Sequence, residues 1–116
     1  MFALVITLTL SFSATFDGAE IAYQKGYFDK AFSFFEKLSI QGNSMAQQRF
    51  GSMYYMGHGV KKDYEKSSYW FEKSANQGNM AGEYFMAYNY EKGIGVKQDI
   101  DKAIEDAYLV GRKDNI

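Results

Sequence analysis

The chain repeats itself with a period of 36 residues, and this repeat constrains the fold more than any other feature of the sequence. The repeated pairs are Gly57 and Gly93, Gly59 and Gly95, Val60 and Val96, Lys61 and Lys97, Asp63 and Asp99, and Lys66 and Lys102. A constant period of this length is typical of stacked supersecondary units that cannot bury their apolar faces alone. The repeat therefore predicts a solenoid.

A third copy of the unit precedes these two in altered form. Its second half keeps the 36-residue offset, so that Phe35 corresponds to Phe71, whereas its first half fits an offset of 32, so that Tyr23 corresponds to Tyr55. The difference is explained by a shorter turn around Gly26. We therefore predict one domain over residues 15–116, with units at about 16–42, 43–78 and 79–113.

Helical periodicity runs through each unit. Ala46, Phe50, Met53 and Tyr54 fall at positions i, i+4, i+7 and i+8, which is one face of a helix. Asn43 or Ser44 is the expected N-cap. Small residues occupy the equivalent site of the first helix in every unit (Ala19, Gly51 and Ala87), and we expect two helices to pack closely there. No strand pattern competes after residue 15.

The glycine loop and the helix after it follow from the same pattern. Glycines supply the positive φ angles that end a helix, and the valine after the second glycine is expected to pack onto the core. Asp63 and Asp99 are the expected N-caps of the next helices. The expected buried residues of the second helices are Tyr64, Ser67, Trp70, Phe71, Ser74 and Ala75 in one unit and Ile100, Ala103, Ala107 and Val110 in the next. Acidic side chains expected to face water are Glu65, Glu72, Asp101, Glu105 and Asp106.

Composition excludes several classes of function. The chain has 116 residues and no cysteine, which rules out disulfides, thiolate metal sites and thiol catalysis. The net charge of −1 argues against a nucleic-acid surface. The single histidine, His58, lies in a glycine loop, and no phosphate-binding signature or nucleophile–base pair is present. We therefore predict no enzymatic activity, no cofactor and no metal.

The first 14 residues differ from the rest. They carry no charge and contain an apolar run of signal-peptide length, followed by the small residues Ser11, Ser13 and Ala14, although no basic residue precedes the run. We predict a signal peptide over residues 1–14, hence a periplasmic or secreted protein. The alternative is a buried N-terminal segment of a cytoplasmic protein. Beyond such a signal, no membrane association is expected.

The repeated residues resemble those of the Sel-one-like repeat family, which is related to the tetratricopeptide repeats. The second unit matches the family pattern at Ala46, Gly51, Tyr54, Gly57, Gly59, Val60, Asp63, Trp70, Phe71, Ala75 and Gly78. The third unit matches at Tyr90, Gly93, Gly95, Val96, Asp99, Ala103 and Ala107, and departs from the pattern at Gly82, Ala87 and Asp106. The resemblance implies an all-α solenoid of about three helix-turn-helix repeats, wound as a right-handed superhelix, whose concave face binds other proteins without catalytic residues.

In this architecture the first helix of each pair lines the concave side. Once the buried positions are set aside, the residues expected to face the groove are Phe16, Glu20, Tyr23, Gln48, Ser52, Tyr55, Tyr84, Tyr88 and Glu91. Tyrosine is enriched at interfaces because it buries a large area while keeping a polar tip. We therefore expect a monomeric adaptor that binds a protein partner in this groove. The alternative is an inhibitor or immunity protein that blocks a toxin or secreted enzyme.

Overall fold

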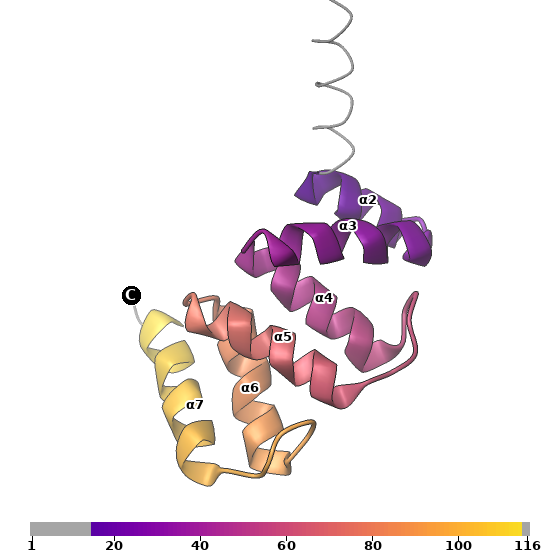
Figure 1. Cartoon of the computed structure of the whole chain (residues 1–116). Helices are drawn as coiled ribbons and strands as arrows, with labels where there is room; N and C mark the ends of the chain where they lie inside the picture. The colour runs from indigo at the N-terminus through magenta and orange to yellow at the C-terminus, as the bar shows by residue number, and fades with distance from the viewer. Residues whose placement is uncertain (1–14, 115–116) are drawn as a thin grey trace, which may run out of the picture.

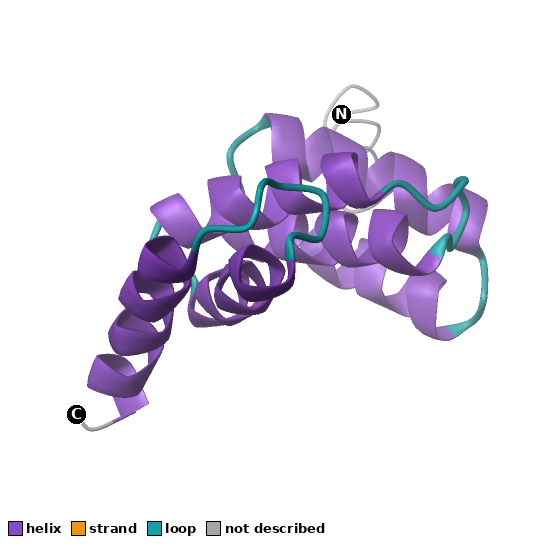
Figure 2. Cartoon of the chain, turned by 90° about the horizontal axis from the view of Figure 1, so that it is seen from below, coloured by secondary structure: helices purple, strands orange, loops and turns teal. Residues whose placement is uncertain are grey.

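The computed structural model describes residues 15–114, which form helices joined by loops, without a strand (Figure 2). The predicted signal peptide, residues 1–14, lies outside the described residues. The helices are α2 (Phe16–Gln24), α3 (Phe28–Ile40), α4 (Ser44–Met56), α5 (Tyr64–Asn76), α6 (Met80–Lys92) and α7 (Ile100–Asp114). They pair as α2–α3, α4–α5 and α6–α7, one pair for each predicted unit.

The pairs stack in chain order from one end of the molecule to the other (Figure 1). Each helix packs mainly against the helix before it and the helix after it in the sequence. The molecule is elongated, with extents of 56 × 35 × 21 Å. This arrangement confirms the predicted all-α solenoid. None of the helices within residues 15–114 is long and apolar enough to cross a membrane.

The helix ends follow the predicted capping residues. Asn43 caps α4 by accepting a 2.9 Å hydrogen bond from the backbone N–H of Ala46, and Asp63 caps α5 in the same way through Lys66. Asp99 accepts an equivalent bond, 3.1 Å long, from the N–H of Lys102 in α7. Each of these side chains satisfies a backbone donor that has no partner within the helix.

The second glycine of each long loop allows the loop to touch the previous unit. Gly59 has a φ of +73°, and a Cβ placed on it would lie 2.6 Å from the carbonyl oxygen of Phe28. Gly95 has a φ of +68°, and a Cβ there would collide with the carbonyl oxygen of Tyr64. Any side chain at either position would therefore have to displace the backbone of the second helix of the previous unit, which is α3 for Gly59 and α5 for Gly95. Close approach, in addition to the positive φ, is why glycine stands at these two positions.

The core consists of two apolar clusters. The first joins α2, α3 and α4 around the fully buried Phe35 and Phe50, and the second joins α5, α6 and α7 around Phe71 and Met86. Phe71 also lies against α4, because a Cβ on Gly51 would be only 2.8 Å from its Cδ1 atom. The close packing of helices predicted at Gly51 is therefore confirmed.

Five burial predictions are wrong. Tyr64 and Ile100, the first residues of α5 and α7, are exposed, and so is Ala107, which lines the open cleft between α6 and α7. Glu72 and Asp106, which were predicted to face water, are half-buried. Glu72 accepts a 2.9 Å hydrogen bond from the hydroxyl of Tyr90, which ties α5 to α6.

Candidate functional site

Eight of the nine predicted groove residues line three adjoining hollows along the first helices of the units. The first hollow, about 360 Å³, lies between α2 and α4 and is lined by Glu20, Tyr23, Gln48 and Ser52, among others. The second, about 270 Å³, lies between α4 and α6, and Ser52, Tyr55, Tyr84 and Tyr88 line it. The third, about 500 Å³, lies between α6 and α7 and includes Tyr84, Tyr88 and Glu91.

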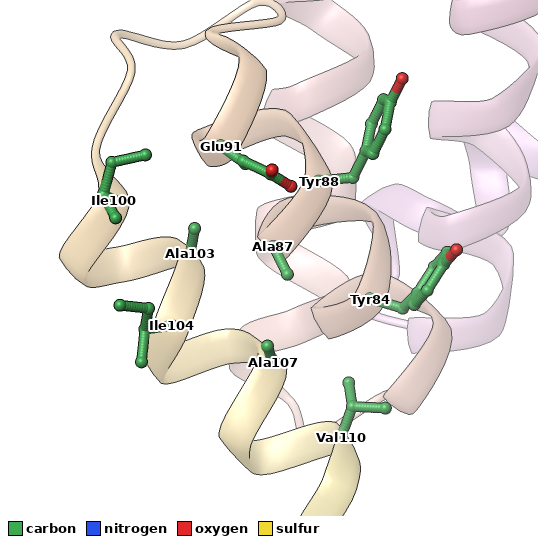
Figure 3. A pocket seen from close by; sticks show the side chains of 9 residues that line it. All are labelled: Tyr84, Ala87, Tyr88, Glu91, Ile100, Ala103, Ile104, Ala107 and Val110. Carbon is green, nitrogen blue, oxygen red and sulfur yellow. The ribbon is translucent and has the colours of Figure 1, made fainter.

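Shared residues join the hollows into one continuous depression. Ser52, Met56 and Phe85 line both the first and the second hollow. Tyr84 and Tyr88 line both the second and the third. We call the first two hollows together the groove, and the third the terminal cleft. In the close view, the rings of Tyr84 and Tyr88 turn away from α7, toward the groove (Figure 3).

Phe16 is the predicted residue that does not line these hollows. Its ring is half-buried and packs edge-on against Phe35 at a centroid distance of 5.8 Å. Phe16 therefore contributes to the core at the first end of the array.

The groove tyrosines differ in exposure. Tyr84 and Tyr88 are 61% and 45% exposed, whereas Tyr55 is half-buried and its ring lies 5.1 Å from that of Tyr64. Exposed aromatic rings on neighbouring turns of α6 offer a large apolar area that costs little side-chain entropy to immobilise. These two rings and Met56, which is 57% exposed, are the accessible apolar part of the groove.

Polar contacts hold the other end of the groove in shape. Arg49 of α4 donates to Glu20 of α2 through Nε at 2.7 Å and through its terminal nitrogen at 3.4 Å. The buried Gln48 donates from Nε2 to Oγ of Ser52 at 3.1 Å. Because these side chains bind one another, the groove keeps polar groups at its α2 end and aromatic rings at its α6 end.

His58 makes a contact that the sequence did not reveal. Its ring stacks on Phe28 with centroids 4.5 Å apart and planes 4° from parallel. Its Nδ1 atom is hydrogen-bonded to the hydroxyl of Tyr23 at 2.8 Å. The loop after α4 is thereby fixed to the first unit. Tyr23 and His58 lie 35 residues apart, and no local sequence pattern links them. Only the stacking of units that repeat every 36 residues could have suggested the contact.

Carboxylates gather where α5, α6 and α7 meet. Burial raises the pKa of Asp106 to about 6, and repulsion by Glu105, Glu83 and Glu72 adds to the effect, while Lys102 opposes it. Burial likewise raises the pKa of Tyr90, and its bond to Glu72 raises it further. Among residues 15–114, no three His, Cys, Asp or Glu side chains are grouped so as to hold a metal ion.

Comparison with known proteins gives a consistent result. The model of the Sel1 repeat family matches residues 19–43, 44–79 and 81–105. No curated protein sequence matches the chain. Among similar solved structures is a protective antigen of uropathogenic Escherichia coli strains, described as displaying an SLR fold, with 32% identity and a TM-score of 0.76 over 80% of this chain.

A Sel1 repeat protein from Oxalobacter formigenes is also similar, with 32% identity and a TM-score of 0.71 over 73% of this chain. The matched regions cover only 21% of the E. coli chain and 25% of the O. formigenes chain. The present chain thus corresponds to about a fifth to a quarter of the length of these relatives.

Proposed function

Because this chain belongs to the Sel1 repeat family, we propose that it is a scaffold that binds a protein partner in the groove along α2, α4 and α6. Sel1 repeats generally mediate protein–protein interaction, and their fold is typically a non-catalytic scaffold. The observation that carries the proposal is the pair of exposed rings of Tyr84 and Tyr88 beside the hollow between α4 and α6. A hydrophobic side chain of the partner would enter this hollow between the tyrosines.

The depth of the hollow suits such an anchor. Its floor includes the fully buried Phe71 and Asn89, so an inserted side chain would meet a rigid apolar ring and one fixed amide. Asn89 donates to Ser68 at 2.9 Å, which holds this amide in place. Buried anchors in preformed pockets usually dominate the binding energy of an interface.

The test begins with a partner captured from the source organism and then purified. Its affinity should fall by about 2 kcal/mol or more, roughly thirtyfold, when Tyr84→Ala and Tyr88→Ala are combined, as expected for aromatic anchors. The matched control combines Tyr27→Ala and Tyr69→Ala, which are 58% and 54% exposed and lie outside the groove. Unchanged affinity in the folded Tyr84/Tyr88 variant would refute the groove as the binding site.

The proposed cellular location is based on residues 1–14 alone. We propose that they direct the chain to the periplasm or out of the cell. Their support is the uncharged apolar run followed by small residues. Mass spectrometry of the mature protein should show that this segment has been removed, and an intact segment on the active protein would contradict the proposal.

A further inference from the structure

The terminal cleft between α6 and α7 has the features of a binding site for another helix. Its α7 side is formed by Ile100, Ala103, Ile104, Ala107 and Val110 (Figure 3). The side chains of Ala103, Ala107 and Val110 face α6, and the cleft opens beside them. Ile104 is 62% exposed, although it is among the most hydrophobic residues of the helix.

The 36-residue offset identifies an equivalent surface on α5, which another helix of the molecule already covers. Ile104, Ala107 and Val110 correspond to Ser68, Phe71 and Ser74 of α5. Those three residues are at most 1% exposed, because α6 covers them and α4 packs against Phe71 and Ser74. Three contacts of that interface involve these residues: Asn89 donates to Ser68, Phe85 stacks on Phe71 at 4.6 Å, and Gly82 lies against Ser74.

We propose that the terminal cleft binds one amphipathic helix of a partner protein, seated on α7 as α6 is seated on α5. The proposed interface would repeat the one between α5 and α6 that the molecule already contains. This site lies beyond the groove of the proposed function and does not depend on it.

The residues that differ between the equivalent surfaces of α5 and α7 define the chemistry of the incoming helix. Ile104 replaces Ser68 and offers no hydrogen bond, so the residue corresponding to Asn89 must be apolar. Ala107 replaces Phe71 and leaves room for a large side chain at the position of Phe85. A small residue fits at the position of Gly82, where the helices approach most closely. The helix therefore carries a small, a large apolar and a second apolar residue at relative positions 1, 4 and 8, which is the spacing of Gly82, Phe85 and Asn89 in α6.

Charge adds a fourth requirement. Glu91 is the single charged residue that lines the cleft, and it corresponds to Tyr55, which lines the same hollow as Tyr88. The incoming helix would thus place the counterpart of Tyr88 near Glu91, where a lysine or arginine fits best. Lys92 lies 3.9 Å from Glu91, but both side chains are more than half exposed, so this pair competes weakly.

A second copy of this chain fits the terminal cleft poorly. The combined offsets of 32 and 36 residues place Asp17 of α2 at the position of Phe85. A carboxylate would then face Ala107 in a cleft whose charged lining residue, Glu91, is itself acidic. A foreign helix with a basic residue is the better occupant.

The probe is a synthetic peptide with the sequence of residues 79–92 carrying Tyr88→Lys and Asn89→Leu. Met80→Lys and Tyr84→Asp, at two positions exposed in the array, allow a side-chain lactam bridge that keeps this short peptide helical. A second peptide carries Tyr88→Glu with the same leucine. We expect the lysine peptide to bind the full chain about threefold to fivefold more tightly than the glutamate peptide, as an exposed ion pair allows. In the Glu91→Lys variant this order should reverse.

Two further variants locate the binding. Ile104→Glu should weaken both peptides more than tenfold, whereas Ile40→Glu, which changes a 72% exposed isoleucine on α3, should not. Tyr55→Ala alters only the groove and should leave peptide affinity unchanged. Equal binding to all variants, or no binding of either peptide to the folded chain, would overturn the proposal. Self-association of the chain that Ile104→Glu abolishes would assign the cleft to a second copy and would overturn it as well.

Discussion

The ring of Phe71 on α5 lies on the ring of Phe85 on α6, with centroids 4.6 Å apart and planes 22° from parallel. This stack joins the second unit to the third, and Phe71 also fills the space left by Gly51. One residue thus contacts helices on both sides of α5. The stability of the third unit should depend on it.

We expect Phe71→Ala to lower the free energy of unfolding by about 3–5 kcal/mol, the usual cost of removing a buried phenylalanine. The milder Phe71→Leu and Phe85→Leu variants and their combination should reveal a coupling of about 0.5–1.5 kcal/mol for the ring pair. Urea unfolding followed by circular dichroism measures both quantities. Strictly additive leucine variants would show that the stack contributes nothing beyond its buried area.

The two glycines of the last loop provide a matched comparison. A Cβ on Gly93 would meet Gln98 at an ordinary 3.5 Å, whereas one on Gly95 would collide with Tyr64. Both residues have positive φ, so Gly93→Ala should cost about 1 kcal/mol of backbone strain. Gly95→Ala should cost about 1–3 kcal/mol more, because α5 or the loop has to shift. Thermal unfolding of the two variants side by side tests the difference, and equal losses would mean that the collision is relieved freely.

Asp106 should make stability depend on pH. Its pKa is raised to about 6 in the folded chain, from an ordinary value of 3.8. The folded chain therefore holds this proton more tightly than the unfolded chain, and stability falls as the pH rises from about 4 to about 6.

Asp106→Asn should remove this loss and stabilise the chain at pH 7.5 by about 1 kcal/mol, well below the full value for a buried group because solvent screens the half-buried carboxylate. Urea unfolding at several pH values would show the two curves converging toward pH 4. Glu36→Gln, which removes an exposed carboxylate on α3, is the control. Curves for Asp106→Asn and the unchanged chain that stay parallel would rule out the effect.

The Tyr23–His58 bond should stabilise the junction of the first two units. Tyr23→Phe removes the hydroxyl but keeps the ring, and we expect a loss of about 0.5–1.5 kcal/mol, typical of one hydrogen bond. Tyr27→Phe makes the same chemical change on a 58% exposed tyrosine of the neighbouring turn and should be neutral. Differential scanning calorimetry of both variants provides the measurement. A loss of equal size in both would point to a general effect of the hydroxyl.

Repeated residues made most of the fold predictable. The caps Asn43, Asp63 and Asp99 and the glycines that end α4 and α6 follow local rules, so the helix boundaries could be derived from the sequence. The periodic pattern failed at Tyr64 and Ile100, since it states which face of a helix is apolar but not how far the neighbouring helix extends.

The groove was partly predictable for a related reason. Offsets brought Tyr55, Tyr84 and Tyr88 together correctly, because equivalent residues of stacked units lie side by side. The contact of His58 with Tyr23 joins side chains of different units, and the raised pKa of Asp106 depends on its burial and on carboxylates of three helices, none of which shares a sequence pattern. Such contacts become visible only once the units are stacked. Binding by the groove residues stays a prediction.

The neighbour-only packing of the helices has a mechanical consequence. Since each helix is held mainly by the helices adjacent in sequence, α2 and α7, at the two ends of residues 15–114, are not among the helix pairs in close contact. A molecule stretched between its ends should peel apart hairpin by hairpin, in a series of small force peaks rather than a single rupture. For the same reason, we expect the chain to extend at low force and to refold quickly when the force is released.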